Sequence, residues 1–300
     1  MGPDTKRGRC NGSMMRRYSS GLSISVALPS PVPKWLQEWM DDVVIDCMKC
    51  AIVEVGTTIA VRKLGSSVLL AVDRMLQSKN TSYLTFERTA RFPKLLLSTD
   101  RSFAVGSWGL MAANPDLVDY EFPKWIQPTL EKQFETVAAI SDEIRVRALQ
   151  TFSTGLEQFL KARAENSAEG KYTVGFIVAG RIGDNTEVHV VTVFHSGNNV
   201  SVPVVEVEVI SEGDYMAGQT AAINKVLADD KSEIVRFGTA YGPVRNALAG
   251  LPDLPKELLE DASQLLSFVA LEALADPTRV GAGYTFAWMT GEEGFRIATF

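Results

Sequence analysis

The sequence predicts an α+β fold in which two β-sheets stack face to face and helices cover both outer sides. Runs of β-branched and aromatic residues alternate with helical blocks, in the order strands, helices, strands, helices, strands. No internal repeat or clear linker interrupts the chain after residue 51. The 300 residues therefore predict one large domain over residues 57–300, behind an N-terminal extension over residues 1–56.

The N-terminal extension differs in composition from the rest of the chain. Its first 33 residues are basic and rich in Ser and Gly, and Asp4 is their single acid. This composition is typical of a flexible leader or propeptide, with a transit peptide as the alternative. We expect a cytoplasmic protein, or an organellar one if the leader is a transit peptide. Apolar residues spaced by three and four then predict a short amphipathic helix over residues 34–50.

The next segment predicts strands. Three β-branched or aromatic runs bounded by glycine or charge are expected to form them: Ile52–Val61, Val68–Val72 and Ser102–Val105. Prolines interrupt residues 109–137, which predicts short pieces there. Ser141, followed by two acids, predicts the start of a helix that runs to about Arg163.

The second half predicts strands, helices and a hairpin in turn. Two strands, Tyr172–Ala179 and Glu187–Phe194, are joined by a turn at Gly183, and a strand pair is expected around residues 201–210. Helices are expected over Met216–Leu227 and Lys256–Leu274. The final hairpin is expected to join Tyr284–Met289 to Phe295–Phe300.

Composition argues against several classes of protein. No apolar run approaches the roughly 20 residues that span a bilayer, so no membrane-embedded chain is expected. The net charge of -6 argues against a nucleic-acid partner, which calls for a basic surface. The three cysteines precede Thr57 and predict no disulfide framework, and Cys47 and Cys50 have no neighbouring ligands for a zinc site. We therefore expect no metal and no cofactor.

The sequence around Thr57 suggests a specific chemistry. Gly56-Thr57-Thr58 begins one predicted strand, and Asp73 ends the next, sixteen residues after Thr57. A threonine freed as a new N-terminus carries its own base, because its α-amine titrates near 7.7 to 8.0 and can accept the hydroxyl proton. Glycine before it suits a strained scissile bond. The alternative is an ordinary strand start, since threonine favours strands in any case.

Several short motifs together resemble the proteasome β-subunit family of N-terminal-nucleophile hydrolases. The strongest are Gly56-Thr-Thr-Ile-Ala-Val-Arg-Lys63 and Val68-Leu-Leu-Ala-Val-Asp73-Arg74, with Phe103-Ala-Val-Gly106-Ser-Trp-Gly109 and Phe237-Gly-Thr-Ala-Tyr-Gly242 in support. The resemblance covers Gly56 to Phe300. It implies the four-layer αββα sandwich of that family.

The resemblance also implies roles for individual residues. Thr57 would be the nucleophile, Asp73 the acid that orients the site, and Gly106 the donor of an oxyanion-hole amide. Both Lys94 and Arg91 lie near the position of the family's essential lysine, and an arginine there would not act as an adjustable base.

Two further positions depart in part from the family pattern. Thr239 stands where a serine is usual and keeps a hydroxyl. Asp276 fits a supporting carboxylate, but Arg279 replaces the serine expected three residues later.

The motifs and the resemblance are compatible with three functions. The first is a threonine peptidase that cleaves itself before Thr57 and acts on peptide or protein substrates. The second is a catalytically inactive subunit of a proteasome-like assembly. The third is an amidase of the same class that acts on small amides. A homo- or hetero-oligomer is expected, and for the first two a ring.

Overall fold

The computed structural model describes residues 53–54, 57–74, 93–113, 120–153, 171–196, 203–277, 280–281, 283–291 and 293–300. Contacts divide the chain into Met1–Ile45 and Asp46–Phe300, and all described residues belong to the second unit. The predicted leader and the predicted helix over residues 34–50 lie outside the described residues. The boundary at residue 56 therefore stays a prediction.

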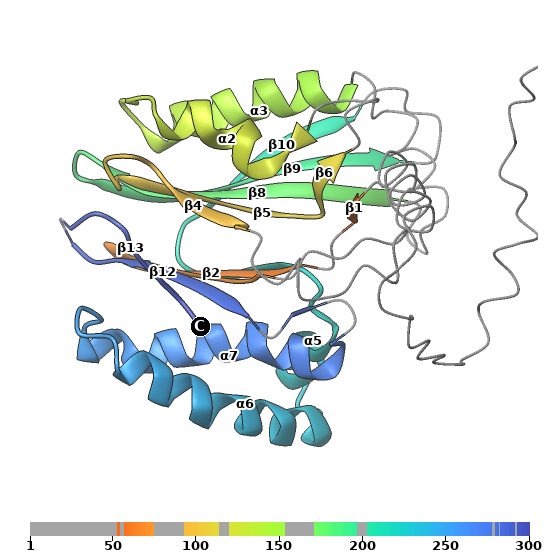
Figure 1. Ribbon diagram of the computed structural model, residues 1–300, viewed down its shortest axis with the longest axis vertical. Helices are drawn as coiled ribbons and strands as arrows, with labels where there is room; N and C mark the ends of the chain where they lie inside the picture. Colours follow the sequence, from red (N-terminus) through yellow and green to blue (C-terminus); the bar gives the residue numbers. More distant parts are fainter. Residues whose placement is uncertain are drawn as a thin grey trace, which may run out of the picture. The chain divides into compact units, whose positions relative to one another are not determined.

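The described residues form an α+β fold with two five-stranded antiparallel sheets and five α-helices (Figure 1). We call the sheet with the order β10-β9-β8-β5-β4 sheet I, and the one with the order β11-β2-β3-β12-β13 sheet II. The strands of sheet I are β4 (Leu95–Leu97), β5 (Phe103–Trp108), β8 (Lys171–Ile182), β9 (Asn185–Ser196) and β10 (Val204–Ile210). Those of sheet II are β2 (Thr58–Leu64), β3 (Ser67–Asp73), β11 (Gly213–Gly218), β12 (Tyr284–Met289) and β13 (Arg296–Thr299).

The two sheets share a hydrophobic core. Ile59, Val61 and Leu70 of sheet II belong to one buried cluster with Ile177 and Val190 of sheet I. Successive side chains of a strand point to opposite faces, so the neighbours of these residues face away from this core. A strand with helices on one face and a second sheet on the other is apolar throughout, which explains the continuous run Val68–Val72.

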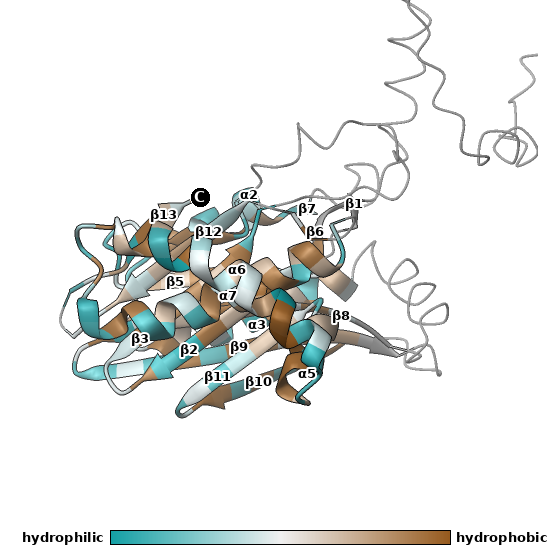
Figure 2. Cartoon of the chain, turned by 90° about the horizontal axis from the view of Figure 1, so that it is seen from below, coloured by the Kyte–Doolittle hydropathy of each residue, from teal (hydrophilic) through white to brown (hydrophobic). Residues whose placement is uncertain are grey.

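Helices cover the outer face of each sheet (Figure 1). α2 (Phe122–Leu130) and α3 (Val137–Ser153) pack on sheet I in one buried cluster. α7 (Leu259–Ala275) packs on sheet II, and α6 (Lys231–Ala249) packs against α7. Figure 2, seen from this side, shows α6 and α7 lying over the strands of sheet II. The shorter elements are α5 (Ala221–Leu227), the 3-10 turn Lys256–Leu258, and the small sheet of β1 (Val53–Glu54), β6 (Leu110–Ala113) and β7 (Tyr120–Glu121).

Most predicted strands and the final helix and hairpin are confirmed. The described pieces within residues 109–137 are short, and α2 accommodates Pro123 in its first turn, but Pro128 lies inside α2 and does not end it. The helix predicted from Ser141 begins earlier, at Val137. The Thr136 hydroxyl accepts the amide of Ala139 and caps this helix, while the Ser141 hydroxyl bonds back to the Val137 carbonyl inside it. The predicted extension beyond Ser153 lies outside the described residues.

Two predictions around residues 201–227 are wrong. A single strand, β10, lies near residues 201–210, and the strand after it joins the other sheet. That strand, β11, runs to Gly218, so the helix predicted from Met216 begins only at Ala221. Pairing with β2 along its whole length outweighs the helical pattern of this segment.

The sequence reading also missed α6. Gly238, Gly242 and Pro243 weaken any helical prediction, since proline removes one helical hydrogen bond. The structure offsets this loss in two ways. The Asp230 carboxylate caps the helix by accepting the amides of Ser232 and Glu233, and an apolar face packs against α7.

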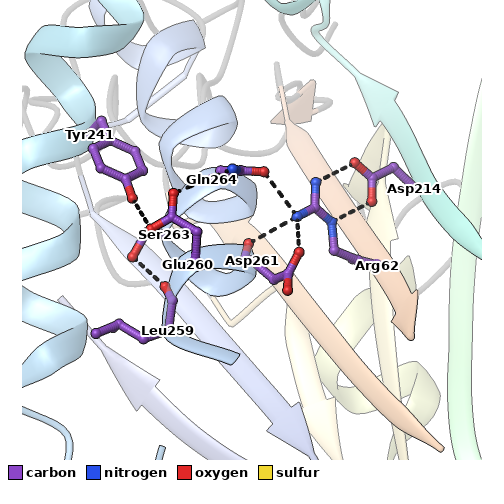
Figure 3. Close-up of polar contacts among 8 residues, drawn as sticks. All are labelled: Arg62, Asp214, Tyr241, Leu259, Glu260, Asp261, Ser263 and Gln264. Atoms are coloured by element: carbon purple, nitrogen blue, oxygen red, sulfur yellow. Dashed lines mark hydrogen bonds and ion pairs between the residues drawn. The ribbon is translucent and has the colours of Figure 1, made fainter. Parts of the chain in front are cut away.

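Arg62 links three elements of the sheet II side (Figure 3). It is nearly buried on β2 and binds its cross-strand partner Asp214 of β11 through two hydrogen bonds of 2.6 and 2.7 Å. It also donates to Asp261 of α7 at 2.6 Å and to Gln264 at 3.2 Å. The hydrogen bonds to Asp214 raise the pKa of Arg62, against the opposing effect of burial. The guanidinium thus fastens an edge strand and a helix to β2.

We expect Arg62→Met to lower the free energy of unfolding by about 1–3 kcal/mol, because two carboxylates lose a charge-assisted partner. Urea unfolding followed by circular dichroism measures the change. The matched control is Arg145→Met, since the ion pair of Arg145 with Asp142 is exposed and should matter by less than about 0.5 kcal/mol. Equal effects of the two variants would contradict the assignment.

Candidate active site

Asp73 is the centre of a buried polar cluster at the end of β3. Its side chain is fully buried. One carboxylate oxygen accepts the amide of Thr58 at 2.9 Å, and the other accepts the ammonium of Lys94 at 2.9 Å and the amide of Gly281 at 3.5 Å. A buried carboxylate requires such partners, because an unpaired charge in the interior is strongly unfavourable.

Lys94 lies immediately before β4 and is fully buried as well. Its carbonyl accepts the amide of Ser107 on β5, which fixes the backbone from which the side chain reaches Asp73. Burial lowers the pKa of Lys94, and the charge of Asp73 and the hydrogen bond to it oppose this shift. The structure therefore places Lys94 beside Asp73. Arg91 lies outside the described residues.

Thr57 comes directly before β2 and is 1% exposed. Its hydroxyl is buried and has no hydrogen-bond partner among the described residues. Such a group is costly and calls for an explanation, because buried hydroxyls are normally paired. The amide of the next residue, Thr58, donates a hydrogen bond to Asp73. The Thr57 hydroxyl is therefore one residue away from the buried ion pair of Asp73 and Lys94.

Gly218 and Gln219 hold the backbone of Thr57 and Thr58, and we call these two residues the strap. The amide of Gln219 donates to the Thr57 carbonyl at 2.8 Å, and the Thr58 hydroxyl donates to the Gln219 carbonyl at 2.8 Å. Gly218 has a φ of +85°, and a Cβ there would overlap the Thr57 carbonyl oxygen. Only glycine fits at this position. The sequence reading missed the strap because it placed a helix over this segment.

Gly106 lies in β5, opposite Leu95 of β4 and Ile177 of β8. A Cβ at this position would collide with the terminal methyl of Ile59, which would have to shift, so glycine allows the close packing of the two sheets here. Hydrogen-bonded positions alternate along an antiparallel strand. Because the Ser107 amide bonds toward β4, this alternation directs the Gly106 amide toward β8. The structure gives Gly106 a packing role, and the predicted oxyanion role stays a prediction.

The remaining two predicted residues lie in different surroundings. Thr239 is exposed on α6, where its hydroxyl donates to the Val235 carbonyl of its own helix, so it does not join the cluster around Asp73. Asp276 ends α7, and its carbonyl accepts the amide of Val280. The residue after Val280, Gly281, donates its amide to Asp73. Arg279 lies outside the described residues.

Tyr284 is a neighbour of the cluster that the sequence reading did not single out. The register of β12 and β3 places it opposite Asp73. Burial raises the pKa of Tyr284 to about 12, and the charge of Asp73 adds to this effect. The phenol is therefore protonated at neutral pH. The predicted C-terminal hairpin places Tyr284 on a strand, but the sequence does not show that this strand pairs with the one that carries Asp73.

The cluster has the chemical elements of a proton-transfer site. A lysine with a lowered pKa shares a buried carboxylate with the amide next to an unpaired threonine hydroxyl. The residues that the structure describes include no group of three His, Cys, Asp or Glu side chains able to hold a metal ion. Among the described helices, none is long and apolar enough to cross a membrane.

Comparison with protein-family models gives no match, and comparison with the sequences of curated proteins gives none either. The function proposed below is therefore inferred from the geometry of the Asp73 cluster and from the motifs that resemble the proteasome β-subunit family.

Proposed function

We propose that this chain is a threonine-type peptidase of the proteasome-like N-terminal-nucleophile class, which cleaves itself before Thr57. The observation that carries the proposal is the buried Asp73–Lys94 pair, which binds the amide of Thr58, next to a Thr57 hydroxyl that has no hydrogen-bond partner in the described part of the chain. The resemblance assigned Thr57 and Asp73 to these roles from their spacing. It left two candidates for the lysine position, and the contact of Lys94 with Asp73 supports Lys94.

The fold supports the same proposal. Two stacked antiparallel sheets with helices packed on both outer faces are compatible with the αββα sandwich of this class. Thr57 and Asp73 lie near the same ends of the neighbouring strands β2 and β3, beside the core between the sheets. Other functions occur on similar architectures, so the site carries more weight than the fold.

Self-cleavage requires a base other than the α-amine of Thr57, because that nitrogen is still part of the peptide bond. In this proposal the neutral amine of Lys94 takes the Thr57 hydroxyl proton, and the oxygen attacks the carbonyl carbon of Gly56. The carbon–nitrogen bond breaks, the nitrogen takes up a proton, and an ester forms at the Thr57 oxygen. Water then hydrolyses the ester and releases residues 1–56.

Substrate hydrolysis uses the α-amine that this cleavage frees. The amine, with an ordinary pKa near 7.7 to 8.0, accepts the Thr57 hydroxyl proton as the oxygen attacks a substrate carbonyl. It returns the proton to the leaving amine, and water hydrolyses the acyl-enzyme that remains. Lys94 and Asp73 fix the local charge throughout, and the strap holds the Thr57 backbone in place.

The N-terminal residue of the purified protein tests this proposal. We expect intact mass and N-terminal sequencing to show a chain that begins at Thr57, and we expect this chain to hydrolyse short fluorogenic peptides. The physical reason is that the carboxylate and the lysine are already paired within the fold and that the carboxylate binds the residue after Thr57. A purified native chain that still begins near Met1 and leaves the peptides intact would contradict the proposal.

One observation favours the second candidate, an inactive subunit of a proteasome-like ring. Thr239, at the position of the family's serine, turns its hydroxyl to its own helix on an exposed surface. A ring that contains the chain but gains no peptidase activity from it would support this candidate. The third candidate, a small-amide amidase, would form a small oligomer, and mass photometry distinguishes it from a ring.

A further inference from the structure

We propose that Glu272 is a positioning residue for Thr57, which acts by holding the strap Gly218–Gln219 in place through α5. The inference rests on the proposed function, since it concerns the residue assigned there as the nucleophile. Glu272 touches neither Thr57 nor the Asp73–Lys94 pair in any described contact. It lies on α7 and contacts the beginning of α5, which follows the strap in the chain.

Glu272 supplies the cap that α5 lacks. The residue before this helix, Thr220, makes no side-chain cap to it. The Glu272 carboxylate, on α7, instead accepts the amide of Ile223 at 2.8 Å, and the amide of Ala222 lies close enough to lower the pKa of this carboxylate. These are amides of the first helical turn, which have no acceptor within their own helix. A side chain from α7 thus fixes the beginning of α5.

The beginning of α5 fixes the strap in turn. Gln219 precedes Thr220 in the chain and binds the Thr57 carbonyl and the Thr58 hydroxyl. A short covalent path therefore joins the capped amides to the bond that holds the Thr57 carbonyl and to the bond of the Thr58 hydroxyl beside it. A nucleophile displaced by about 1 Å can cost about 10²-fold in rate, so the anchoring of this path has catalytic consequences.

The burial of the Glu272 carboxylate is energetically unfavourable, so the fold keeps this cap of α5 despite a desolvation penalty. The side chain is 2% exposed. Burial raises its pKa, the hydrogen bonds from Ile223 and Ala222 oppose this, and the negative charges of Glu233 and Asp276 raise it further. Glu233, on α6, is itself paired with Arg236 and lies 4.0 Å from Lys225. An apolar residue would be cheaper to bury here, but it would leave the first amides of α5 without an acceptor.

Glu272→Ala, Glu272→Gln and the matched control Glu260→Ala test the inference. We expect Glu272→Ala to slow both self-cleavage and peptide kcat at least about tenfold with KM nearly unchanged, because the nucleophile moves while the substrate-binding surface does not. Glu272→Gln keeps an acceptor oxygen and should stay within about threefold of the wild type. Glu260, on the same helix, is exposed and bonds to Tyr241 (Figure 3), so its variant should match the wild type.

Hydrogen exchange gives a readout that does not depend on activity. In Glu272→Ala, the amides of Gln219, Ala222 and Ile223 should exchange about tenfold faster, while the core amides of β3 keep their wild-type protection. Should this variant fail to fold, Glu272→Met, which fills the same space, takes its place. Unchanged exchange and kcat would overturn the inference. A wild type that neither cleaves itself nor hydrolyses peptides would overturn the proposed function, while the exchange measurement still decides the role of Glu272.

Discussion

Replacing Thr57 with alanine should abolish self-cleavage and lower peptide hydrolysis at least about 10³-fold, because the variant has no oxygen to form the ester or the acyl-enzyme. The fold should persist, since the Thr57 hydroxyl has no hydrogen-bond partner among the described residues and its removal breaks no hydrogen bond there. Intact mass of the purified variant should show an uncleaved chain, and a fluorogenic peptide assay should show background rates.

Two further variants make this result interpretable. Thr57→Ser keeps a hydroxyl and should still cleave itself. Thr299→Ala, at an exposed threonine of β13, is the matched control and should behave as the wild type. Self-cleavage of Thr57→Ala at the wild-type rate would exclude Thr57 as the nucleophile.

Removing the charge of Asp73 should have the largest effect on stability. In Asp73→Asn the ammonium of Lys94 remains fully buried without its charged partner, so we expect a loss of about 3–5 kcal/mol in the free energy of unfolding, together with loss of self-cleavage. Urea unfolding measures the first effect and intact mass the second. A loss below about 1 kcal/mol would show that the pair is not held in the interior.

A double variant separates stability from function at this pair. Asp73→Leu combined with Lys94→Met replaces both charges by apolar groups, and such exchanges are often neutral or stabilising for buried ion pairs. The double variant should therefore recover part of the stability lost in Asp73→Asn, because the amides of Thr58 and Gly281 still lose their acceptor, and it should fail to cleave itself. Self-cleavage in the double variant would contradict a role of the pair in proton transfer.

The pH dependence of self-cleavage tests Lys94 as the base. Burial lowers the pKa of Lys94, so the neutral amine accumulates as the pH rises through a value below the ordinary lysine pKa. The rate of self-cleavage should rise over that range. Lys94→Arg should show no such rise, because a guanidinium does not lose its proton in a protein. The same rise in Lys94→Arg would assign the base to another group.

The proximity of Thr57 and Asp73 could be predicted from their spacing in the sequence, because the two residues lie at the ends of one β-hairpin. β2 and β3 are antiparallel neighbours joined by a turn at Gly65, and their register brings Thr58 and Asp73 to the same end. Alternating strand faces and a glycine turn are short-range features. The strand pattern of β8 and β9 and the apolar face of α7 are of the same kind, which is why these elements were predicted and confirmed.

Elements whose local sequence favours another structure could not be predicted from such short-range patterns. α6 carries two glycines and a proline, and it forms because it is capped and packs against α7. The end of β11 has a helical pattern and is a strand because β2 pairs with it. In both cases packing against another element, α7 for α6 and β2 for β11, determines the secondary structure. A prediction from the local sequence of the segment alone does not include that element.

The α+β class, the hairpin that carries Thr57 and Asp73, and the spacing between them could be predicted, because they follow from propensities and patterns within a few residues. The contacts of Lys94 with Asp73, of Gly218 and Gln219 with Thr57, and of Glu272 with α5 could not, because they form between segments that are distant in the chain. These contacts join residues that are at least 21 positions apart in the chain. Each depends on how whole sheets and helices pack, which no local pattern encodes.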